Sequence, residues 1–192
     1  MSSIIPSRQA RRVVVLAVTV VAAACDAGAT TAPGGARAAL ADSPAASRDV
    51  DLGSCSNLAA PAGAKVSAHY YATGTQNYWW SGTGWVFVGP TAELFADAGL
   101  HGAVGIHYSG PTWVSNSGSG VVGIIAQRCT PDASAIQWLG LNAVSSRGPG
   151  IFEGTTFIQR INTTGGLVPT APGTYFGENV RVPYTAEYVF YR

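Results

Sequence analysis

The sequence predicts an all-β protein, an antiparallel β-sandwich or closed β-barrel of about 8–10 short strands with one short helical turn. Three observations support this prediction. Apolar and polar residues alternate in short runs from Leu52 onward, as they do between Lys65 and Ala72. Glycine, proline, asparagine and serine interrupt these runs every few residues. No helix-length periodic segment lies between the runs, so parallel crossover connections are not expected.

The expected strands are taken from the alternating runs. They cover residues 65–72, 76–80, 85–88, 103–108, 112–115, 121–128, 136–143, 154–162 and 181–191. The helical turn is expected at Thr91 to Ala96, with Thr91 as its N-terminal cap and Gly99 beyond its end. A single domain covering residues 52–192 is long enough to bury one core.

Composition bounds the classes of function. Apolar residues make up 47% and charged residues 11% of the 192 positions, so the chain as a whole is not disordered. Of the 11 basic residues, Arg8, Arg11 and Arg12 lie near the N-terminus, and without them 8 basic residues stand against 10 acidic ones. The domain therefore has no expected basic surface for phosphates, and nucleic acid is not an expected partner.

The first 25 residues have the layout of a bacterial export signal. Three arginines precede an apolar run from Val13 to Ala24, which is too short for a permanent membrane span. Cys25 follows Ala22 to Ala24, as the acylated cysteine follows the small residues of a bacterial lipoprotein signal. We therefore expect lipidation at Cys25 and an extracytoplasmic protein anchored to the membrane of the cell envelope. The alternative is ordinary signal cleavage and a soluble secreted protein.

Residues 26–51 are rich in alanine, glycine, proline and serine and have no apolar period. Such a segment cannot bury enough surface to offset the entropy of ordering it, so it is predicted to be a flexible tether. With Cys25 lipidated, Cys55 and Cys129 remain as an even pair in an oxidising compartment. We predict a disulfide between them, the alternative being two unrelated buried thiols.

Six stretches of the domain carry a family resemblance. They are Gly74 to Tyr78, His107 to Trp113, Gly118 to Gly123, Ile136 to Leu139, Ile158 to Gly166 and Arg181 to Tyr191. In their order and spacing they resemble the domain-of-unknown-function family 3455 of bacteria and fungi. The resemblance implies an exported β-rich domain without an established activity.

The chain also departs from the pattern of that family. Relatives tend to carry one cysteine where Trp80 stands and another near residues 170–173, and both are missing here. The resemblance therefore implies that a bond between Cys55 and Cys129 takes the place of a cross-link between the two missing cysteines. An aspartate usual at Ser117 and a proline usual at Gln137 are also absent. The lost aspartate weakens any mechanism that needs a carboxylate at that turn.

Gly118 to Gly123 matches the letters of a dinucleotide-binding fingerprint, but its context does not. The fingerprint needs a helix opening on the glycines and an acidic residue about 20 positions further on. Here the chain continues as a strand, and no acidic residue lies near Val144. A hairpin turn explains the same glycines.

Several side chains are candidates for a site. Three histidines, His69, His101 and His107, could form a zinc or copper site, but only His107 lies in a family stretch, so no metal is expected. Arg160 and Glu187 lie on strands that could be neighbours. We expect a structural ion pair between them. The alternative is that they bind an anion or a carboxylate in a cavity shared with His107. Adjacent Trp79 and Trp80 point to opposite faces, so one is available for stacking on a sugar or a partner.

The expected function is a binding or structural module that takes a glycan or a small apolar ligand, without a cofactor. The candidate ligand-binding residues are His107, Tyr108, Trp113, Gln159, Arg160 and Tyr184. The alternative is an enzyme whose pocket combines five of them, all except Gln159. No serine-hydrolase elbow or zinc-protease motif is present in the sequence.

Overall fold

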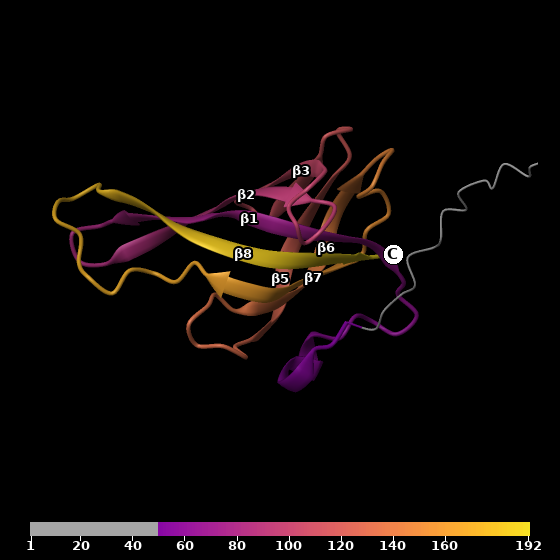
Figure 1. Cartoon of the computed structure of the whole chain (residues 1–192), viewed down its shortest axis with the longest axis horizontal. Helices are drawn as coiled ribbons and strands as arrows, with labels where there is room; N and C mark the ends of the chain where they lie inside the picture. Colours follow the sequence, from indigo (N-terminus) through magenta and orange to yellow (C-terminus); the bar gives the residue numbers. More distant parts are fainter. Residues whose placement is uncertain (1–49) are drawn as a thin grey trace, which may run out of the picture. The chain divides into compact units, whose positions relative to one another are not determined.

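The computed structural model describes residues 50–192, in which eight antiparallel strands close into one barrel in sequence order (Figure 1). The strands are β1 (Val66–Trp80), β2 (Trp85–Phe95), β3 (Ala103–Tyr108), β4 (Thr112–Ser115), β5 (Gly120–Cys129), β6 (Trp138–Arg147), β7 (Phe157–Gly165) and β8 (Asn179–Tyr191). Closure is made by β1, which pairs with both β2 and β8. The all-β prediction is confirmed in its barrel form. The predicted signal, the acylation of Cys25 and nearly all of the predicted tether lie outside the described residues.

Alternation along β8 shows why these sequences form barrel strands. Tyr184, Ala186, Tyr188 and Phe190 are buried and belong to the main hydrophobic core, whereas Glu187 between them lies on the opposite face. Successive side chains of a strand point to opposite faces, so this pattern places one set in the interior of the barrel and the other outside it.

Two predictions about local structure need correction. The predicted stretches 65–72 and 76–80 belong to one continuous strand from Val66 to Trp80, which lies so close to β2 at Gly74 that an added Cβ would collide with the backbone of Thr91 and Ala92. The expected helical turn at Thr91 to Ala96 is wrong. Residues 91–95 belong to β2, where buried Ala92 and Leu94 alternate with the more exposed Thr91, Glu93 and Phe95.

Helical structure in residues 50–192 is limited to one short 3₁₀ helix, η1 (Gly53–Leu58). Its buried residues are Cys55 and Leu58. No helix of this part of the chain has the length and apolarity needed to cross a membrane.

The glycines between β4 and β5 serve a turn, as predicted. Gly118 has a φ of 91°, a conformation that glycine adopts readily, and its N–H donates to the Ser115 carbonyl. The chain then continues directly into β5, which pairs antiparallel with β4. A helix does not open on these glycines, so the dinucleotide fingerprint is excluded by its context.

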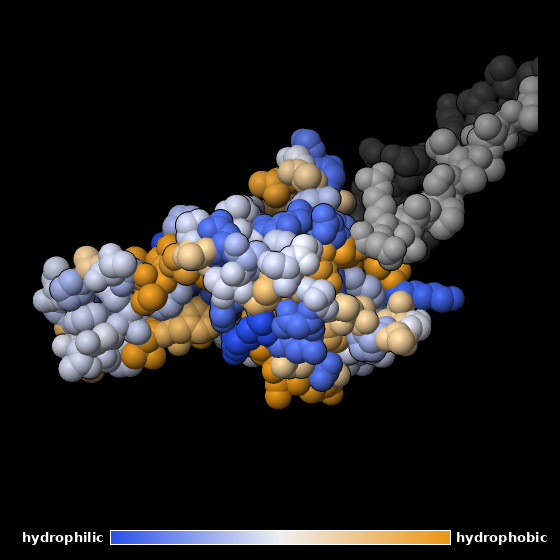
Figure 2. Space-filling view, turned by 90° about the horizontal axis from the view of Figure 1, so that it is seen from below, coloured by the Kyte–Doolittle hydropathy of each residue, from blue (hydrophilic) through white to orange (hydrophobic). Residues whose placement is uncertain are grey.

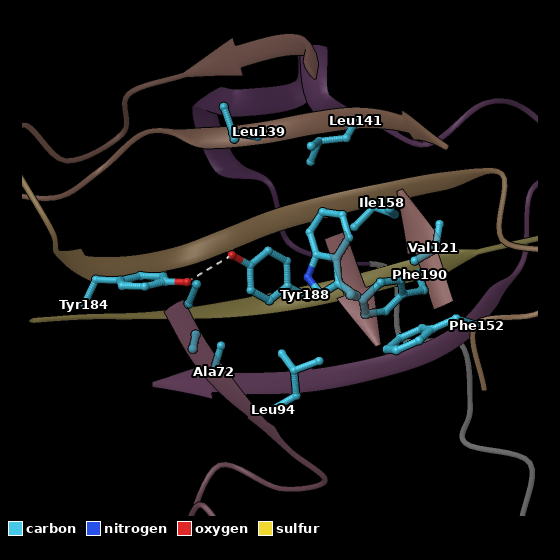
Figure 3. Close-up of a cluster of buried hydrophobic side chains, with 13 residues drawn as sticks. Ala72, Leu94, Val121, Leu139, Leu141, Phe152, Ile158, Tyr184, Tyr188 and Phe190 are labelled. Carbon is cyan, nitrogen blue, oxygen red and sulfur yellow. Dashed lines mark hydrogen bonds between the residues drawn. The ribbon is translucent and has the colours of Figure 1, made fainter. Parts of the chain in front are cut away.

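Aromatic and aliphatic side chains together fill the interior of the barrel (Figure 3). Trp113 is 1% exposed, stacks on His107 with ring centroids 4.4 Å apart, and meets Tyr188 and Phe190 edge-on. Phe152 packs against Phe190 from the loop before β7. Edge-on and offset arrangements are the favourable geometries for aromatic pairs, so this cluster fixes the packing of β3, β4 and β8.

A second apolar cluster lies outside the barrel, where residues 50–64 cover the outer face of β7 and β8. Phe157, Ile161, Val189 and Tyr191 form its buried part. The covering segment is bonded covalently, because Cys55 and Cys129 form the predicted disulfide with a Cα–Cα distance of 5.7 Å. The bond joins η1 to the end of β5.

One end of the barrel extends into an arm (Figure 1, left). We define the arm as the hairpin of residues 77–88 together with residues 171–180, which run alongside it. Trp80 donates its backbone N–H to the Glu178 carbonyl, and Gly177 donates its N–H to the Trp80 carbonyl. The Trp85 indole N–H donates to the Ala171 carbonyl at 2.8 Å.

Candidate functional site

The barrel interior brings together four of the six predicted site residues. His107, Trp113 and Tyr184 are buried there, and Arg160 pairs in register with buried Tyr188. We call these four predicted residues the interior set. Tyr184 and Tyr188 bring their hydroxyl oxygens to 3.4 Å (Figure 3). Burial raises the pKa of both phenols, and the nearby Arg160 guanidinium opposes part of the rise for each.

The other two predicted residues lie elsewhere. Tyr108 is 40% exposed and lines a smaller concavity of about 230 Å³ between β3 and β6. Gln159 is buried on the outer side of β7, where it donates to the Leu58 carbonyl and accepts from the Tyr191 hydroxyl. It therefore anchors the covering segment and is not part of the interior set. Both departures follow from strand alternation, since each residue directly neighbours an inward-facing one.

His107 is a neutral residue of the core. It is 3% exposed, and burial lowers its pKa to about 3. Its Nδ1 lies 2.9 Å from the Thr112 carbonyl oxygen, so the proton of the neutral ring is on Nδ1. An enclosed imidazole with so low a pKa is a weak base that a substrate does not reach, so it is poorly suited to proton transfer.

Arg160 does not pair with Glu187, and the predicted bridge is wrong. Its Nε and Nη2 donate to the Gln137 carbonyl oxygen at 3.1 and 2.7 Å. In the register of β7 and β8, Arg160 lies opposite Tyr188, whereas Glu187 lies opposite Ile161. The two side chains therefore point to opposite faces of the sheet.

A loop closes the interior set on one side. An added Cβ at Gly166 would come within 3.0 Å of Gln76, Tyr184 and Ile136, and the Tyr78 hydroxyl donates to the Gly166 carbonyl at 2.8 Å. Among residues 50–192, Gln76 Nε2 and Trp113 Nε1 are buried without a hydrogen-bond acceptor. The interior thus contains two enclosed donors without acceptors.

An open groove of about 820 Å³ lies on the outer face of β1, β7 and β8. It is lined by Val50, Asp51, Gly53, Val66, Ser67, Ala68, His69, Tyr71, Trp138, Ile161, Asn162, Glu187 and Val189. Its volume falls within the range of about 300–1,000 Å³ that is typical of small-molecule sites. The lining includes two carboxylates and no lysine or arginine.

A hydrogen-bonded carboxylate and imidazole lie in this groove. His69 Nε2 is 2.7 Å from one oxygen of Glu187, and Asn162 Nδ2 donates to the other at 3.0 Å. The hydrogen bond from His69 keeps the pKa of Glu187 below its usual value against the effect of burial, so Glu187 is ionised at neutral pH. The side chains of His69 and Glu187 are 38% and 23% exposed, which leaves both reachable from solvent.

Two local features hold these groups in place. Asn162 has a φ of 48° at an irregularity of β7, where the register with β8 shifts between Ile161 and Thr164. Irregularities of this kind redirect a side chain, and asparagine tolerates the left-handed conformation better than most residues. The His69 ring stacks on Tyr71 with centroids 5.0 Å apart and planes at 24°. The groove therefore combines a stacked pair of rings with a fixed carboxylate.

The three histidines lie in three separate places, so they do not share a metal. His69 lies in the groove and His107 in the core, while exposed His101 pairs with Asp97 at 3.1 Å. Within residues 50–192, histidine, cysteine and acidic side chains form no cluster of three that could hold a metal ion.

Comparison with known families agrees with the sequence pattern. The model of the family described as "Protein of unknown function (DUF3455)" matches residues 61–192. The chain belongs to the DUF3455 family. No curated protein and no solved structure matches it. The function of this DUF3455 member is therefore inferred from the geometry of its own side chains.

Sequence reasoning missed the groove of this DUF3455 domain. The sequence suggests His69 only as a metal ligand and Glu187 only as a partner of Arg160, although the alternation of β1 places Ser67, His69 and Tyr71 on one face. The missing information was the pairing of β1 with the last strand, which places His69 opposite Val189 and next to Glu187.

Trp79 and Trp80 are both half-buried and pack against Phe176 and Trp85, respectively, within the arm.

Proposed function

We propose that this DUF3455 domain is a binding module that holds a neutral, hydroxyl-rich ligand, such as a sugar unit of a glycan, in the outer groove. The observation that carries the proposal is the pair of His69 and Glu187 beside stacked rings in an open groove of about 820 Å³. Sites of this size with a few fixed polar groups and aromatic walls are the usual form of small-ligand sites.

The chemistry of the lining favours such a ligand. A sugar ring has an apolar face of C–H groups, which can pack against the stacked rings of His69 and Tyr71, and hydroxyls at its edge that donate to carboxylates. Asp51 and Glu187 supply acceptors, and no lysine or arginine of the lining would attract a phosphate or carboxylate. A neutral ligand is therefore favoured over an anionic one.

The interior set supports a structural role better than the enzymatic alternative. A pocket for catalysis would need His107, Tyr108, Trp113, Arg160 and Tyr184 around one accessible space. Tyr108 faces away from the others, and His107 is neutral and enclosed. Because the reacting groups of an enzyme must reach its substrate, the open groove is the better candidate site.

Calorimetric titration with a panel of neutral oligosaccharides, derived from cellulose, chitin and starch, tests the groove. We expect at least one saturable binder, and Glu187→Gln should weaken it about tenfold or more, because the amide loses the charge and one acceptor oxygen. Asp97→Asn is the matched control, since it alters the His101–Asp97 pair outside the groove and should leave affinity unchanged. Absence of any binder, or equal losses in both variants, would refute the proposal.

We also propose that the protein is exported and anchored through acylated Cys25 to the membrane of the bacterial cell envelope. The disulfide of the domain supports this, because such bonds persist in oxidising extracytoplasmic compartments. Intact-mass measurement of the mature protein should show a chain that begins at a lipid-modified Cys25. A mature chain that begins at an unmodified residue after Cys25 would contradict the anchor.

A further inference from the structure

The arm carries an apolar surface, and its hairpin of residues 77–88 contains no charged residue. Val86, Phe87, Val88, Tyr175 and Phe176 are 40%, 53%, 54%, 65% and 73% exposed. From residue 72 to residue 92 the sequence contains no lysine, arginine, aspartate or glutamate. Figure 2 shows the arm in pale and orange tones at the left, whereas the saturated blue residues gather over the barrel.

This surface includes an unpaired strand edge. Within residues 50–192, β2 pairs with β3 only from Thr91 to Phe95, so residues 85–90 have β1 on one side and no strand on the other. An apolar edge strand without charged residues is a template for a further strand, and proteins normally protect such edges. Pro90 and the irregularity opposite Asn77 and Tyr78 limit the regular edge to residues 85–87.

The direction of the backbone groups at this edge follows from the bonds of Trp80. Its N–H and C=O pair with residues 177–178, on the side away from β2. In an antiparallel pair, opposite residues direct their backbone groups in opposite directions, so Trp85, which faces Trp80, directs its N–H and C=O to the open edge. Phe87, two residues further, does the same.

We propose that two copies of this chain associate by antiparallel pairing of these edges, with Val86 of each copy on the two-fold axis. Trp85 of one copy then lies opposite Phe87 of the other, and all four outward N–H groups and all four outward C=O groups along residues 85 and 87 are paired. The edge is self-complementary because it is uncharged and because aromatic cross-strand pairs are favourable. A two-fold dimer is also the commonest closed assembly of identical chains.

Substitution at the axis tests this dimer in the full chain. By analytical ultracentrifugation, the unmodified protein should dimerise, and Val86→Lys should raise the dimer dissociation constant about tenfold or more, because two lysines would then lie directly opposite each other. Val144→Lys, at a valine that is 62% exposed on β6, is the matched control and should leave the dimer unchanged. Circular dichroism checks that both variants are folded.

Cross-linking tests the register. In a Cys25→Ser background, Val86→Cys should form a disulfide-linked dimer on mild oxidation, because facing residues of a non-hydrogen-bonded pair have Cα atoms about 4.5 Å apart. Val144→Cys should not cross-link at the same concentration. The proposal would be overturned by a protein that stays monomeric, or by equal cross-linking of the two variants. If the monomer floats with neutral phosphatidylcholine vesicles, the arm contacts lipid and not a second copy.

Discussion

Replacement of both Cys55 and Cys129 by alanine should lower the free energy of unfolding by about 4 kcal/mol on the chain-entropy model. The bond closes a loop with a sequence separation of 74, and its loss gives the unfolded chain more conformations. It also releases η1, which packs beside β5 and β6. Urea unfolding monitored by tryptophan fluorescence measures the change.

Reduction of the unmodified protein provides the control for this experiment. Cys55 is fully buried, so alanine would also leave a small cavity, whereas reduction breaks the cross-link and leaves both sulfur atoms. We expect the reduced protein to lose a similar amount. If reduction and double substitution each cost less than about 1 kcal/mol, the disulfide would not be the main attachment of the covering segment.

Acidification should destabilise the protein through His107. Its pKa is about 3 in the folded state, against an ordinary value of 6.5. Between these values the unfolded chain binds a proton that the folded protein does not. Stability contributed by the neutral ring is therefore complete above about pH 6.5 and declines as pH falls toward 3, by on the order of 1.4 kcal/mol for each pH unit.

His107→Phe tests this prediction because it keeps a ring against Trp113 and removes the titration. Between pH 7 and pH 5 the unmodified protein should lose stability relative to the variant as pH falls. Above pH 7 the difference in their unfolding free energies should stay constant. This range lies above the titration of carboxylates such as Glu187, whose lowered pKa gives a loss of stability at more acidic pH. A difference that does not depend on pH would show that folding does not lower the pKa of His107.

Much of the fold could be predicted from the sequence because strand alternation is a local property. The predicted bounds of β3 and β4 agree with the structure, and the turn at Gly118 was expected from glycine alone. The segment from Thr91 to Ala96 resembles a helix in sequence because it combines a capping residue with helix-forming alanine, glutamate and leucine. Pairing with two neighbouring strands overrides that local preference.

The candidate site was less predictable because it depends on register. A change of one residue moves a side chain to the other face, so the positions of Gln159, Arg160 and Glu187 could not be assigned before the pairing of β7 and β8 was known. The groove also depends on a long-range contact, because residues 50–53 form part of its wall beside β1 and β8. Residue types indicated a polar cluster, but only the pairing showed which residues share it.

Pairing of β1 with β8 also affects how the chain reaches its folded state. Lys65 and Arg192 exchange two backbone hydrogen bonds, so the seam of the barrel joins residues separated by more than a hundred positions. Contacts of such high sequence separation slow folding, because the chain entropy of a long loop is lost before the contacts form. During synthesis the barrel therefore stays open until the last strand emerges, and a nascent chain truncated before β8 should remain sensitive to proteases.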